Sequence, residues 1–544
     1  MGNLPTVGNY LLDELKRLGV NRVFGIPGDY IIKFFKLVED DPAIDLCTFS
    51  HEPAVGFAAI AEARATKKPA VSVVTYGPGA LNMVNAVACA YAEKTPLIVI
   101  SGGPAISARH KNFFVHHTIK NCETQLNAYS EVTVAAVILD NPKTSVVKIA
   151  KVLKACQDYM LPVYIEVPAD IINEQITLVN SKQASPPFDN ENNVEAASAE
   201  ILRRLSKAKN PVIIVGVESE RFNLKEHIAQ LSEKLNVPVV STLLARDLIP
   251  TDARNFFGTY LGSAGSVAAE KLVTASDLLL ILGEMLSDVN LGAKLTATKG
   301  PAIIWCFSGQ VNTLDQTYEN VPLKNLLEKL CKAPIDKKDL IFPAKVPLKI
   351  NATCKLTSTP IVMSEVIDAL NWFFSKYGQM PLIADTGDCL FATLKVETST
   401  VMAPSFYATM GFAVPAAIGY ALATEKRPLV LVGDGGFQMT GPEMCHCPRY
   451  GINPIFVVIN NERWGMEQVF YPSARFNELV NWHYSELANL WGGKGYLCNN
   501  CEMLYKALED AEGQKTFTVI EVVTEREELS EQLLAWIKEQ RGEK

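Results

Sequence analysis

Two oxygen-bearing side chains follow short apolar runs in the last quarter of the chain. Asp434 comes after the run 429–432 and a glycine, and Asn461 comes after the run 455–459 and another asparagine. Short β-branched runs that end in turn residues are typical of buried parallel strands, whose carboxyl ends share one edge of a sheet. Carboxylate and amide oxygens suit Mg²⁺, which leaves positions free for phosphate oxygens. The spacing therefore predicts a metal and phosphate site, with two unrelated strand-end turns as the alternative.

Glycines surround the predicted metal-binding aspartate in the sequence Gly433-Asp434-Gly435-Gly436. A residue without a side chain lets the backbone approach a phosphate closely. We therefore expect these glycines to lie beside a bound phosphate group.

Carboxylates and imidazoles also gather in the first quarter of the chain. Glu52 precedes an alanine-rich segment, where a lone carboxylate would ordinarily complement a helix dipole. His116 and His117 are adjacent and follow apolar residues, a place where a single histidine is most often a core residue. Together with Asp29, the pair is typical of a proton relay, because imidazoles titrate near neutrality. Neither histidine has the spaced partner expected of a zinc site.

Strands and helices in alternation must position these residues. In the first 170 residues the pattern predicts helices at 6–19 and 54–65 and strands at 22–26, 46–49, 70–74, 96–100 and 163–168. Repeated strand, turn and helix predict a parallel sheet with helices on both faces. Four of the strand ends carry polar or glycine residues, as a ligand-binding edge requires.

Two further α/β blocks follow the first. The middle block has expected strands near 211–215, 238–240 and 278–282, and its strand ends show no clear chemical constellation. Polar and proline-bearing stretches near 183–193 and 335–355 predict linkers. We therefore predict an α/β chain of three doubly wound parallel-sheet domains, with bounds 1–180, 190–340 and 355–544.

Composition narrows the functional classes. At 544 residues the chain is too long for one core, and its 51 basic and 59 acidic residues give a net charge of −8. The absence of a dense basic cluster argues against a nucleic-acid partner, and no apolar run is long enough to predict a membrane span. The N-terminus lacks the regions of a signal peptide, so the 12 cysteines are expected to be reduced in a cytoplasmic protein.

Several motifs, in this order along the chain, resemble one known family. They are Gly28-Asp29-Tyr30, His51-Glu52, Tyr91-Ala92-Glu93-Lys94-Thr95-Pro96, His116-His117, and Gly433-Asp434-Gly435 through Asn461. Over nearly its full length the chain is similar to thiamine-diphosphate-dependent 2-oxo acid decarboxylases of the pyruvate/indolepyruvate decarboxylase group. The His-His pair is the most discriminating motif, because acetolactate synthase-like relatives generally lack it. The resemblance implies pyrimidine-binding, middle and diphosphate-binding domains, with thiamine diphosphate and Mg²⁺ as cofactors.

The resemblance also implies a role for each matching residue. Glu52 is expected to activate the cofactor through its aminopyrimidine ring. Asp29, His116 and His117 are expected to handle protons, and Glu467 to assist carbon dioxide release and the protonation that follows. The implied cofactor-binding residues are Thr386, Asp388, Ala408, Met410, Gly433, Asp434, Gly435, Gly436 and Asn461, with Met410 as a wedge that bends the cofactor; the implied metal ligands are Asp434, Asn461 and the backbone carbonyl of Arg463.

The implied reaction is the non-oxidative decarboxylation of a 2-oxo acid to an aldehyde and CO₂ through an enamine of the cofactor. In this family the first domain of one subunit meets the third domain of another, so the implied assembly is a homodimer or homotetramer. Two alternatives stay open at this point. One is a carboligase of the acetolactate synthase type, and the other is a non-catalytic homologue that serves as a scaffold or regulatory subunit.

Two positions depart from the family pattern. Arg463 stands in a turn where glycine is usual, and a positive φ there would strain the backbone. Leu390 replaces the large aromatic residue that pyruvate-selective members tend to carry. With the flexible Met466 it predicts a pocket that admits side chains larger than methyl, while Phe470 would narrow that pocket.

Overall fold

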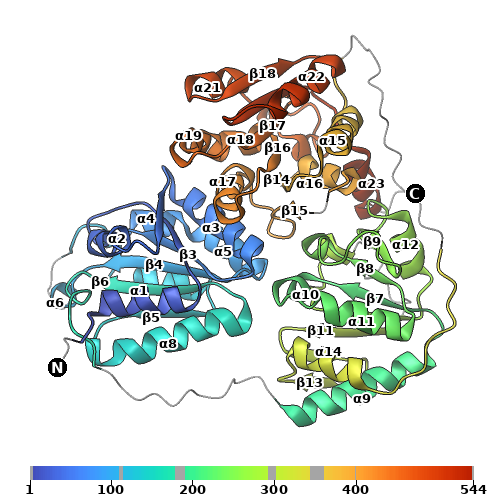
Figure 1. Cartoon of the computed structure of the whole chain (residues 1–544), viewed down its shortest axis with the longest axis horizontal. Helices are drawn as coiled ribbons and strands as arrows, with labels where there is room; N and C mark the ends of the chain where they lie inside the picture. The colour runs from blue at the N-terminus through green and yellow to red at the C-terminus, as the bar shows by residue number, and fades with distance from the viewer. Residues whose placement is uncertain are drawn as a thin grey trace.

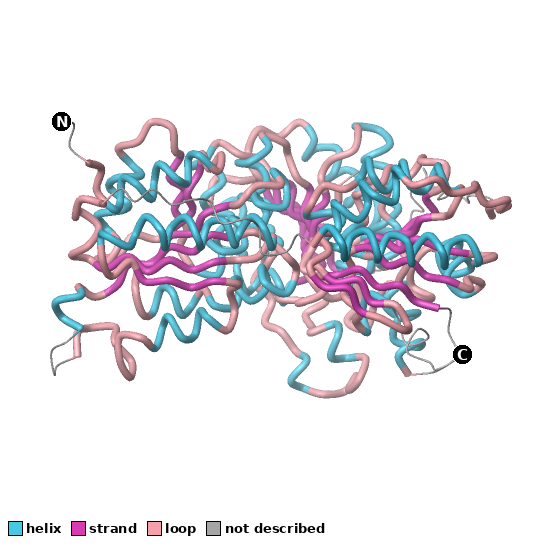
Figure 2. The backbone as a smooth tube through the Cα atoms, turned by 90° about the horizontal axis from the view of Figure 1, so that it is seen from below, coloured by secondary structure: helices cyan, strands magenta, loops and turns pink. Residues whose placement is uncertain are grey.

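The computed structural model describes residues 4–109, 114–177, 190–291, 302–343, 360–398 and 400–541. These residues form three α/β units, each built around one sheet (Figure 1). Figure 2 shows the strands sandwiched between helices on both faces. The three-sheet prediction is therefore confirmed. The predicted linkers fall mostly on 178–189 and 344–359, which lie outside the described residues, although residues 191–193 already belong to a helix.

The first unit is a six-stranded, wholly parallel sheet with the order β2-β1-β3-β4-β6-β5. Its strands are β1 (Arg22–Gly25), β2 (Asp45–Thr48), β3 (Ala70–Val74), β4 (Leu97–Gly103), β5 (Ala135–Ile138) and β6 (Val163–Pro168). Its helices are α1 (Val7–Arg17), α2 (Ile32–Glu39), α3 (Glu52–Thr66), α4 (Pro78–Asn82), α5 (Val84–Ala92), α6 (Ile106–Arg109), α7 (Thr124–Ser130) and α8 (Pro142–Tyr159). Helix α1 begins where the sequence predicts, because the Thr6 side chain caps it by accepting the Asn9 N–H.

The third unit repeats this architecture with the order β15-β14-β16-β17-β19-β18, again wholly parallel. Its strands are β14 (Leu382–Ala384), β15 (Val401–Met402), β16 (Leu429–Gly433), β17 (Ile455–Asn460), β18 (Lys494–Cys498) and β19 (Thr518–Val523). Its helices are α15 (Met363–Tyr377), α16 (Asp388–Ala392), α17 (Ala413–Thr424), α18 (Asp434–Thr440), α19 (Cys447–Tyr450), α20 (Gly465–Gln468), α21 (Tyr484–Leu490), α22 (Cys501–Glu512) and α23 (Glu531–Gln540).

The middle unit has a mixed sheet with the order β13-β12-β11-β10-β7-β8-β9. Its strands are β7 (Pro211–Val215), β8 (Val239–Ser241), β9 (Phe256–Thr259), β10 (Leu278–Leu282), β11 (Ala302–Phe307), β12 (Gln310–Asn312) and β13 (Thr317–Glu319). Its helices are α9 (Glu191–Lys207), α10 (Val217–Arg221), α11 (Lys225–Leu235), α12 (Val267–Thr274), α13 (Asp288–Leu291) and α14 (Leu323–Lys332).

The antiparallel edge of the middle sheet is an addition to the predicted parallel sheet. Strands β11 and β12 pair antiparallel through the two-residue turn Ser308-Gly309, and both turn residues have positive φ. Two left-handed residues in succession are the signature of a tight hairpin turn, and a hairpin reverses the strand. A Ser-Gly pair between apolar runs is the sequence signal for this turn.

Each sheet has a place where the strand order reverses direction. Neighbouring strands at that place are followed by loops that run to opposite sides, which opens a crevice where α/β proteins bind ligands. The crevice lies between β1 and β3 in the first unit, between β10 and β7 in the middle unit, and between β14 and β16 in the third. Asp29 follows β1, and Asp434 follows β16, so both predicted site residues stand at such crevices.

The first and third units share one hydrophobic core. Helices α3 and α17 lie side by side between them (Figure 1), and both carry runs of small residues that are fully buried. A Cβ added at Gly419 would lie only 2.1 Å from the Ala58 carbonyl oxygen, so the two backbones meet without room for a side chain. The pairing holds the two candidate site regions in one rigid body.

No helix in the described ranges combines the length and the apolar composition needed to cross a bilayer.

Candidate active site

The third unit brings Asp434 and Asn461 to the same sheet edge. Strands β16 and β17 pair in a register that sets Gly433 opposite Ile459, so Asp434 and Asn461, which follow the two strands, lie at the same edge of the sheet. Both side chains are buried, and the Asn461 Oδ1 accepts the Arg463 N–H at 3.1 Å. The structure thus places side by side the two strand ends from which the sequence predicts a metal site.

The Asp434 carboxylate has one oxygen satisfied and one oxygen free. Oδ1 accepts the Gly435 N–H at 2.8 Å, whereas Oδ2 is buried and has no hydrogen-bond partner among the described residues. Burial raises the pKa of Asp434 to about 7, and the nearby backbone N–H groups of Gly435 and of residues 461–463 oppose this shift without satisfying Oδ2. A buried carboxylate oxygen without a donor is costly unless a cation or a proton completes it. These residues therefore fit a divalent cation.

The three glycines around Asp434 differ in what surrounds them. A Cβ at Gly433 would meet nothing within 4 Å, so its backbone faces open space. A Cβ at Gly435 would lie 2.3 Å from the Trp464 ring, and one at Gly436 would lie 3.0 Å from the Asp385 carboxyl carbon. Gly433 has the openness expected beside a phosphate, while Gly435 and Gly436 are small because protein packs against them.

The turn after β14 contains Thr386 and Asp388, two predicted cofactor contacts. Gly387 between them has φ +76°, which favours glycine. Asp388 is half-buried, and its carboxylate accepts the N–H of Ser530 at 2.9 Å and also the Ser530 hydroxyl. Ser530 is the N-cap of α23, so Asp388 anchors the last helix of the chain to this turn.

Ala408 and Met410 lie in the loop that precedes α17. Ala408 has φ +55°, a strained value for a residue with a side chain, and Met410 exposes 39% of its surface. From the first unit, the buried Glu93 accepts the N–H groups of Phe406 and Tyr407 at 2.8 and 2.9 Å. A protruding Met410 on a loop fixed by other residues matches the geometry that a wedge requires.

The turn after Asn461 resolves the expected strain at Arg463. The residue with positive φ is Glu462, at φ +54°, and Arg463 is not among the left-handed residues. Arg463 donates from its guanidinium to the Pro472 carbonyl at 2.7 Å. Position 463 thus tolerates a side chain, because the left-handed conformation falls one residue earlier. Glu467 is exposed in α20, three residues beyond Trp464.

The first unit gathers Asp29, His116 and His117 into one cluster. The Asp29 carboxylate lies 2.5 Å from His116 Nε2, and the ring centroids of the two histidines are 4.8 Å apart. Desolvation raises the pKa of Asp29, but the hydrogen bonds from His116 and the Tyr30 N–H, together with the charges of the two imidazoles, outweigh it and leave that pKa below its usual range. One ligand atom from each of the three residues falls within 4.8 Å of the others, and all three residues are exposed. Such a cluster can pass a proton between groups that face solvent.

Two residues to which the sequence assigned no role shape this cluster. Tyr30 stacks on the His116 ring with centroids 4.7 Å apart, and its hydroxyl lies 3.3 Å from His116 Nδ1. A Cβ at Gly77, which has φ +76°, would lie 2.6 Å from the Cβ of His117. Gly77 therefore makes room for His117. The Gly-Pro-Gly run after β3 was the signal that could have indicated this close approach.

Glu52 stands at the start of α3, as the sequence predicts. Its Oε2 accepts a hydrogen bond from the Asn82 amide at 2.7 Å. Asn82 ends α4 and was not predicted to be part of the site. The bond fixes the Glu52 carboxylate at the carboxyl-terminal edge of the first sheet.

The two sets of predicted residues do not touch within one chain. Among the described residues, no hydrogen bond, ion pair or ring contact joins Glu52 or the Asp29 cluster to the residues around Asp434 or Met410. The side chains of Asp29 and His116 are 55% and 61% exposed. Each set therefore presents an open half of a site.

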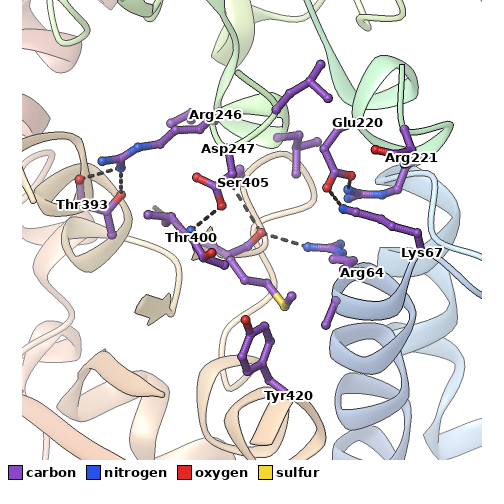
Figure 3. Close-up of a pocket in the computed structure, with 18 of the residues that line it drawn as sticks. Arg64, Lys67, Glu220, Arg221, Arg246, Asp247, Thr393, Thr400, Ser405 and Tyr420 are labelled. Carbon is purple, nitrogen blue, oxygen red and sulfur yellow. Dashed lines mark hydrogen bonds and ion pairs between the residues drawn. The ribbon is translucent and has the colours of Figure 1, made fainter. Parts of the chain in front are cut away.

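A separate cavity of about 340 Å³ lies where all three units meet. Figure 3 shows Arg64 from α3 and Lys67 directly after it, Arg221 and Arg246 from the middle unit, and Thr400 and Tyr420 from the third unit around it. Among the described residues that line it, none is a predicted catalytic, cofactor or metal residue, although Leu390 is one of them. Its buried arginines donate mainly to carbonyl and carboxylate oxygens of neighbouring segments, so this cavity is a junction between the units and not the predicted site.

Comparison with known proteins gives the same division of the chain. Three family models match: the N-terminal TPP-binding domain of thiamine pyrophosphate enzymes at residues 5–126, their central domain at 198–321, and their C-terminal TPP-binding domain at 385–522. The first and third matches include the two half-sites, and the middle match covers the unit with the mixed sheet.

Curated relatives match over nearly the whole chain. Indole-3-pyruvate decarboxylase of Azospirillum brasilense is 38% identical over 535 residues, which is 98% of this chain and 97% of the relative. Pyruvate decarboxylase isozyme 1 of Saccharomyces cerevisiae is 26% identical over 90% of this chain and 89% of its own length, and the pyruvate decarboxylase of Candida albicans is 26% identical over 94% and 93%. The chain therefore belongs to the thiamine-diphosphate-dependent 2-oxo acid decarboxylases and catalyses the non-oxidative decarboxylation of a 2-oxo acid.

Proposed function

We propose that Asp434, Asn461 and the backbone carbonyl of Arg463 hold Mg²⁺ against the diphosphate of the cofactor. The observation that carries this assignment is the buried Asp434 Oδ2, which has no hydrogen-bond partner among the described residues. Mg²⁺ favours few carboxylate ligands together with phosphate oxygens, which suits one aspartate, one amide and one carbonyl. Gly433, which has open space beside it, supplies the backbone approach to the phosphates.

Thiamine diphosphate, when bound, supplies the electron sink that accepts the bonding pair left by the departing CO₂. The chain positions and activates it. Glu52, which Asn82 holds in place, would form a hydrogen bond with a nitrogen of the pyrimidine ring and so activate the ring. Met410 projects from its loop as the wedge that selects the bent form. Thr386, in the turn after β14, and Ala408, in the loop that carries Met410, complete the cofactor-binding surface of the third unit.

The cluster of Asp29, His116 and His117 holds and delivers protons during turnover. Asp29 is ionised at neutral pH, since its pKa is lowered, and it orients His116 through the 2.5 Å contact. The Tyr30 ring supports the same imidazole from its face. Glu467, exposed on α20, is the second active-site carboxylate and acts at the carboxylate end of the substrate.

Bringing Glu52 to Met410 requires a second subunit. Within the described residues of one chain, no hydrogen bond, ion pair or ring contact joins the two half-sites, and Asp29 and His116 stay exposed although a closed site would cover them. A homodimer that sets the first unit of one subunit against the third unit of its partner completes two sites, and two dimers form a homotetramer. Cys47, Cys89 and Cys156 of the first unit and Cys306 and Cys331 of the middle unit are free thiols, which supports a cytoplasmic location.

The proposed substrate is a 2-oxo acid with a side chain larger than methyl, such as an aryl or branched one. Leu390 replaces a large aromatic residue and packs in one apolar cluster with Phe391 and the flexible Met466. The relative with 38% identity is an indole-3-pyruvate decarboxylase, which agrees with a wide pocket.

A substrate panel tests this proposal. Purified enzyme with Mg²⁺ and thiamine diphosphate is given pyruvate, a branched 2-oxo acid, phenylpyruvate and indolepyruvate, and kcat/KM is compared with product identity. Aldehyde is expected throughout, with the larger acids favoured by about tenfold or more, roughly the discrimination of one or two methylenes in an apolar pocket. A preference for pyruvate would reject the wide pocket. Acetolactate as the main product would replace decarboxylation by carboligation, and purified protein that binds neither cofactor would revive a scaffold role.

A further inference from the structure

One buried carboxylate holds the loop that carries Met410. Asp385 follows β14 and exposes 1% of its surface. Its Oδ1 accepts the N–H of Gly411 at 3.1 Å and that of Thr386 at 3.0 Å, and its Oδ2 accepts the N–H of Ala413 at 2.9 Å. Two of these donors flank Met410 on its carboxyl-terminal side, and the third belongs to the predicted diphosphate turn.

The same carboxylate also touches the helix that begins at Asp434. A Cβ on Gly436 would lie 3.0 Å from the Asp385 Cγ and Oδ1, so α18 packs directly on this side chain. Asp385 therefore contacts three segments at once: the turn after β14, the loop before α17, and the first turn of α18. No other residue that we assign to the site joins these three segments.

The loop before α17 needs contacts from other segments to keep its backbone conformation. Ala408 and Gly411 both have left-handed backbones, at φ +55° and +81°, and Met410 between them is partly exposed. Backbone strain of this kind persists only where surrounding contacts fix it. A second side chain besides Asp385 holds this loop. Thr440, at the end of α18, donates from its hydroxyl to the Gly411 carbonyl oxygen, and the two oxygens are 2.6 Å apart.

Burial destabilises the charged form of a carboxylate, and Asp385 shows this effect. Burial raises its pKa to about 6, although four backbone N–H groups oppose the shift. An ionised acceptor forms roughly twice as strong a hydrogen bond with an N–H as a neutral one. A neutral amide has only one accepting oxygen and would turn its own donors toward the backbone N–H groups. A carboxylate accepts the Thr386 and Gly411 N–H groups with one oxygen and the Ala413 N–H with the other.

We propose that Asp385 is a positioning residue that locks the Met410 loop to the turn and helix that hold the diphosphate and its metal. Asp385 touches neither substrate nor the reacting atoms; it sets where Met410 stands relative to Asp434. The inference rests on the proposed roles of Met410 and Asp434. A loosened Met410 leaves the diphosphate bound but lets the cofactor ring leave its reactive geometry, and an error of about 1 Å can cost on the order of 100-fold in rate.

The test is Asp385→Asn in the full-length protein loaded with thiamine diphosphate and Mg²⁺. The readout is exchange of the cofactor's C2 proton for deuterium, measured by NMR after acid quench, without substrate. Cofactor affinity of the apoprotein is measured alongside by tryptophan fluorescence. Exchange is expected to slow by about 10- to 100-fold while the Kd for the cofactor changes by less than about tenfold, because orientation and not diphosphate binding is lost.

Three further variants make the result decisive. Thr440→Val removes the second bond to the Gly411 loop with almost no change in shape, and a smaller slowing of exchange is expected. Glu284→Gln, another buried carboxylate with three donors but in the middle unit, controls for general loss of stability and should leave exchange unchanged. Met410→Ala, alone and combined with Asp385→Asn, tests whether Asp385 acts through Met410, since residues that act as a unit are non-additive.

The outcomes separate the inference from the function on which it rests. If Met410→Ala slows exchange but folded Asp385→Asn does not, the positioning role is wrong while the wedge stands. If Met410→Ala leaves exchange unchanged, the wedge assignment fails first. If Asp385→Asn does not fold, Thr440→Val decides: exchange equal to the parent's overturns the inference, and slowed exchange that adds nothing to Met410→Ala supports it.

Discussion

Glu284 in the middle unit and Asp434 in the third unit stand at equivalent places. Each follows a central strand, β10 or β16, at the point where the strand order of its sheet reverses. Both are almost fully buried, and burial raises the pKa of each to about 7. By position, burial and pKa the two acids are alike.

They differ in what satisfies their oxygens. Glu284 accepts the Thr242 hydroxyl, the Met285 N–H at 2.7 Å and the Asn290 amide at 2.9 Å. Gly216 presses on it so closely that an added Cβ would lie 2.3 Å from the Glu284 Cβ. Asp434 accepts the Gly435 N–H, and its other oxygen has no donor in the part of the chain that the structure describes. A buried acid at a strand end therefore indicates a ligand site when one of its oxygens lacks a hydrogen-bond donor. It indicates a crevice filled by protein when both oxygens have donors.

Substituting each of the two acids should give the largest difference in cofactor binding. Asp434→Ala is expected to weaken binding of Mg²⁺ and thiamine diphosphate by at least about 100-fold, because it removes a metal ligand and not an outer contact. Isothermal titration of the apoprotein with both cofactors measures this loss. Glu284→Gln serves as the matched control and should bind both with unchanged affinity; weakened binding there would show that the middle crevice communicates with the site.

The first unit extends the comparison to a carboxylate that binds no metal. Glu52→Gln keeps the size of the side chain and its bond to Asn82, but it loses the charge that activates the pyrimidine ring. We expect kcat to fall by about 100-fold or more, in the range of general acid–base contributions, with cofactor affinity nearly intact. Steady-state kinetics with fluorescence titration check both numbers, and near-parental turnover would remove Glu52 from activation.

The pH dependence of the apoprotein's thermal stability provides a further test of the buried acid in the middle unit. Burial raises the pKa of Glu284 from its ordinary value of 4.5 to about 7, so the native state binds the extra proton between these values. Stability from this group is therefore present at low pH and lost as pH rises through about 7. The thermal midpoint of Glu284→Gln should rise relative to the parent by a few degrees between about pH 5 and 8. A constant offset across the series would show that Glu284 does not titrate there.

The smallest expected effect concerns Arg463. Because Glu462 carries the left-handed backbone, Arg463→Gly relieves no strain and loses only the bond to the Pro472 carbonyl. A stability loss of about 1 kcal/mol and a less than about twofold change in Mg²⁺ affinity are expected. Thermal unfolding and metal titration provide the check, with Glu462→Gly as the companion that does relieve the left-handed residue.

Much of this site could be predicted from the order of residue types along the chain. Asp434 and Asn461 are visible because apolar runs with a period typical of buried strands end directly before them. Glu52 is visible because it follows a predicted strand end, and the His116-His117 pair is visible because two adjacent histidines follow apolar residues. Three sheets follow from the repeated strand and helix pattern, and the antiparallel edge at Ser308-Gly309 was missed because a two-residue turn changes strand direction without changing periodicity.

The sequence by itself determined which groups can do chemistry and that their strands end at sheet edges, since side-chain chemistry and local periodicity are properties of the chain. Tertiary structure alone decided how each group is satisfied. Asp385 gathers donors from residues 386, 411 and 413, Tyr30 stacks on a histidine 86 positions away, and Gly77 clears space for His117. Hydrogen bonding and close packing depend on which distant segments meet, and that is fixed only when the sheets assemble.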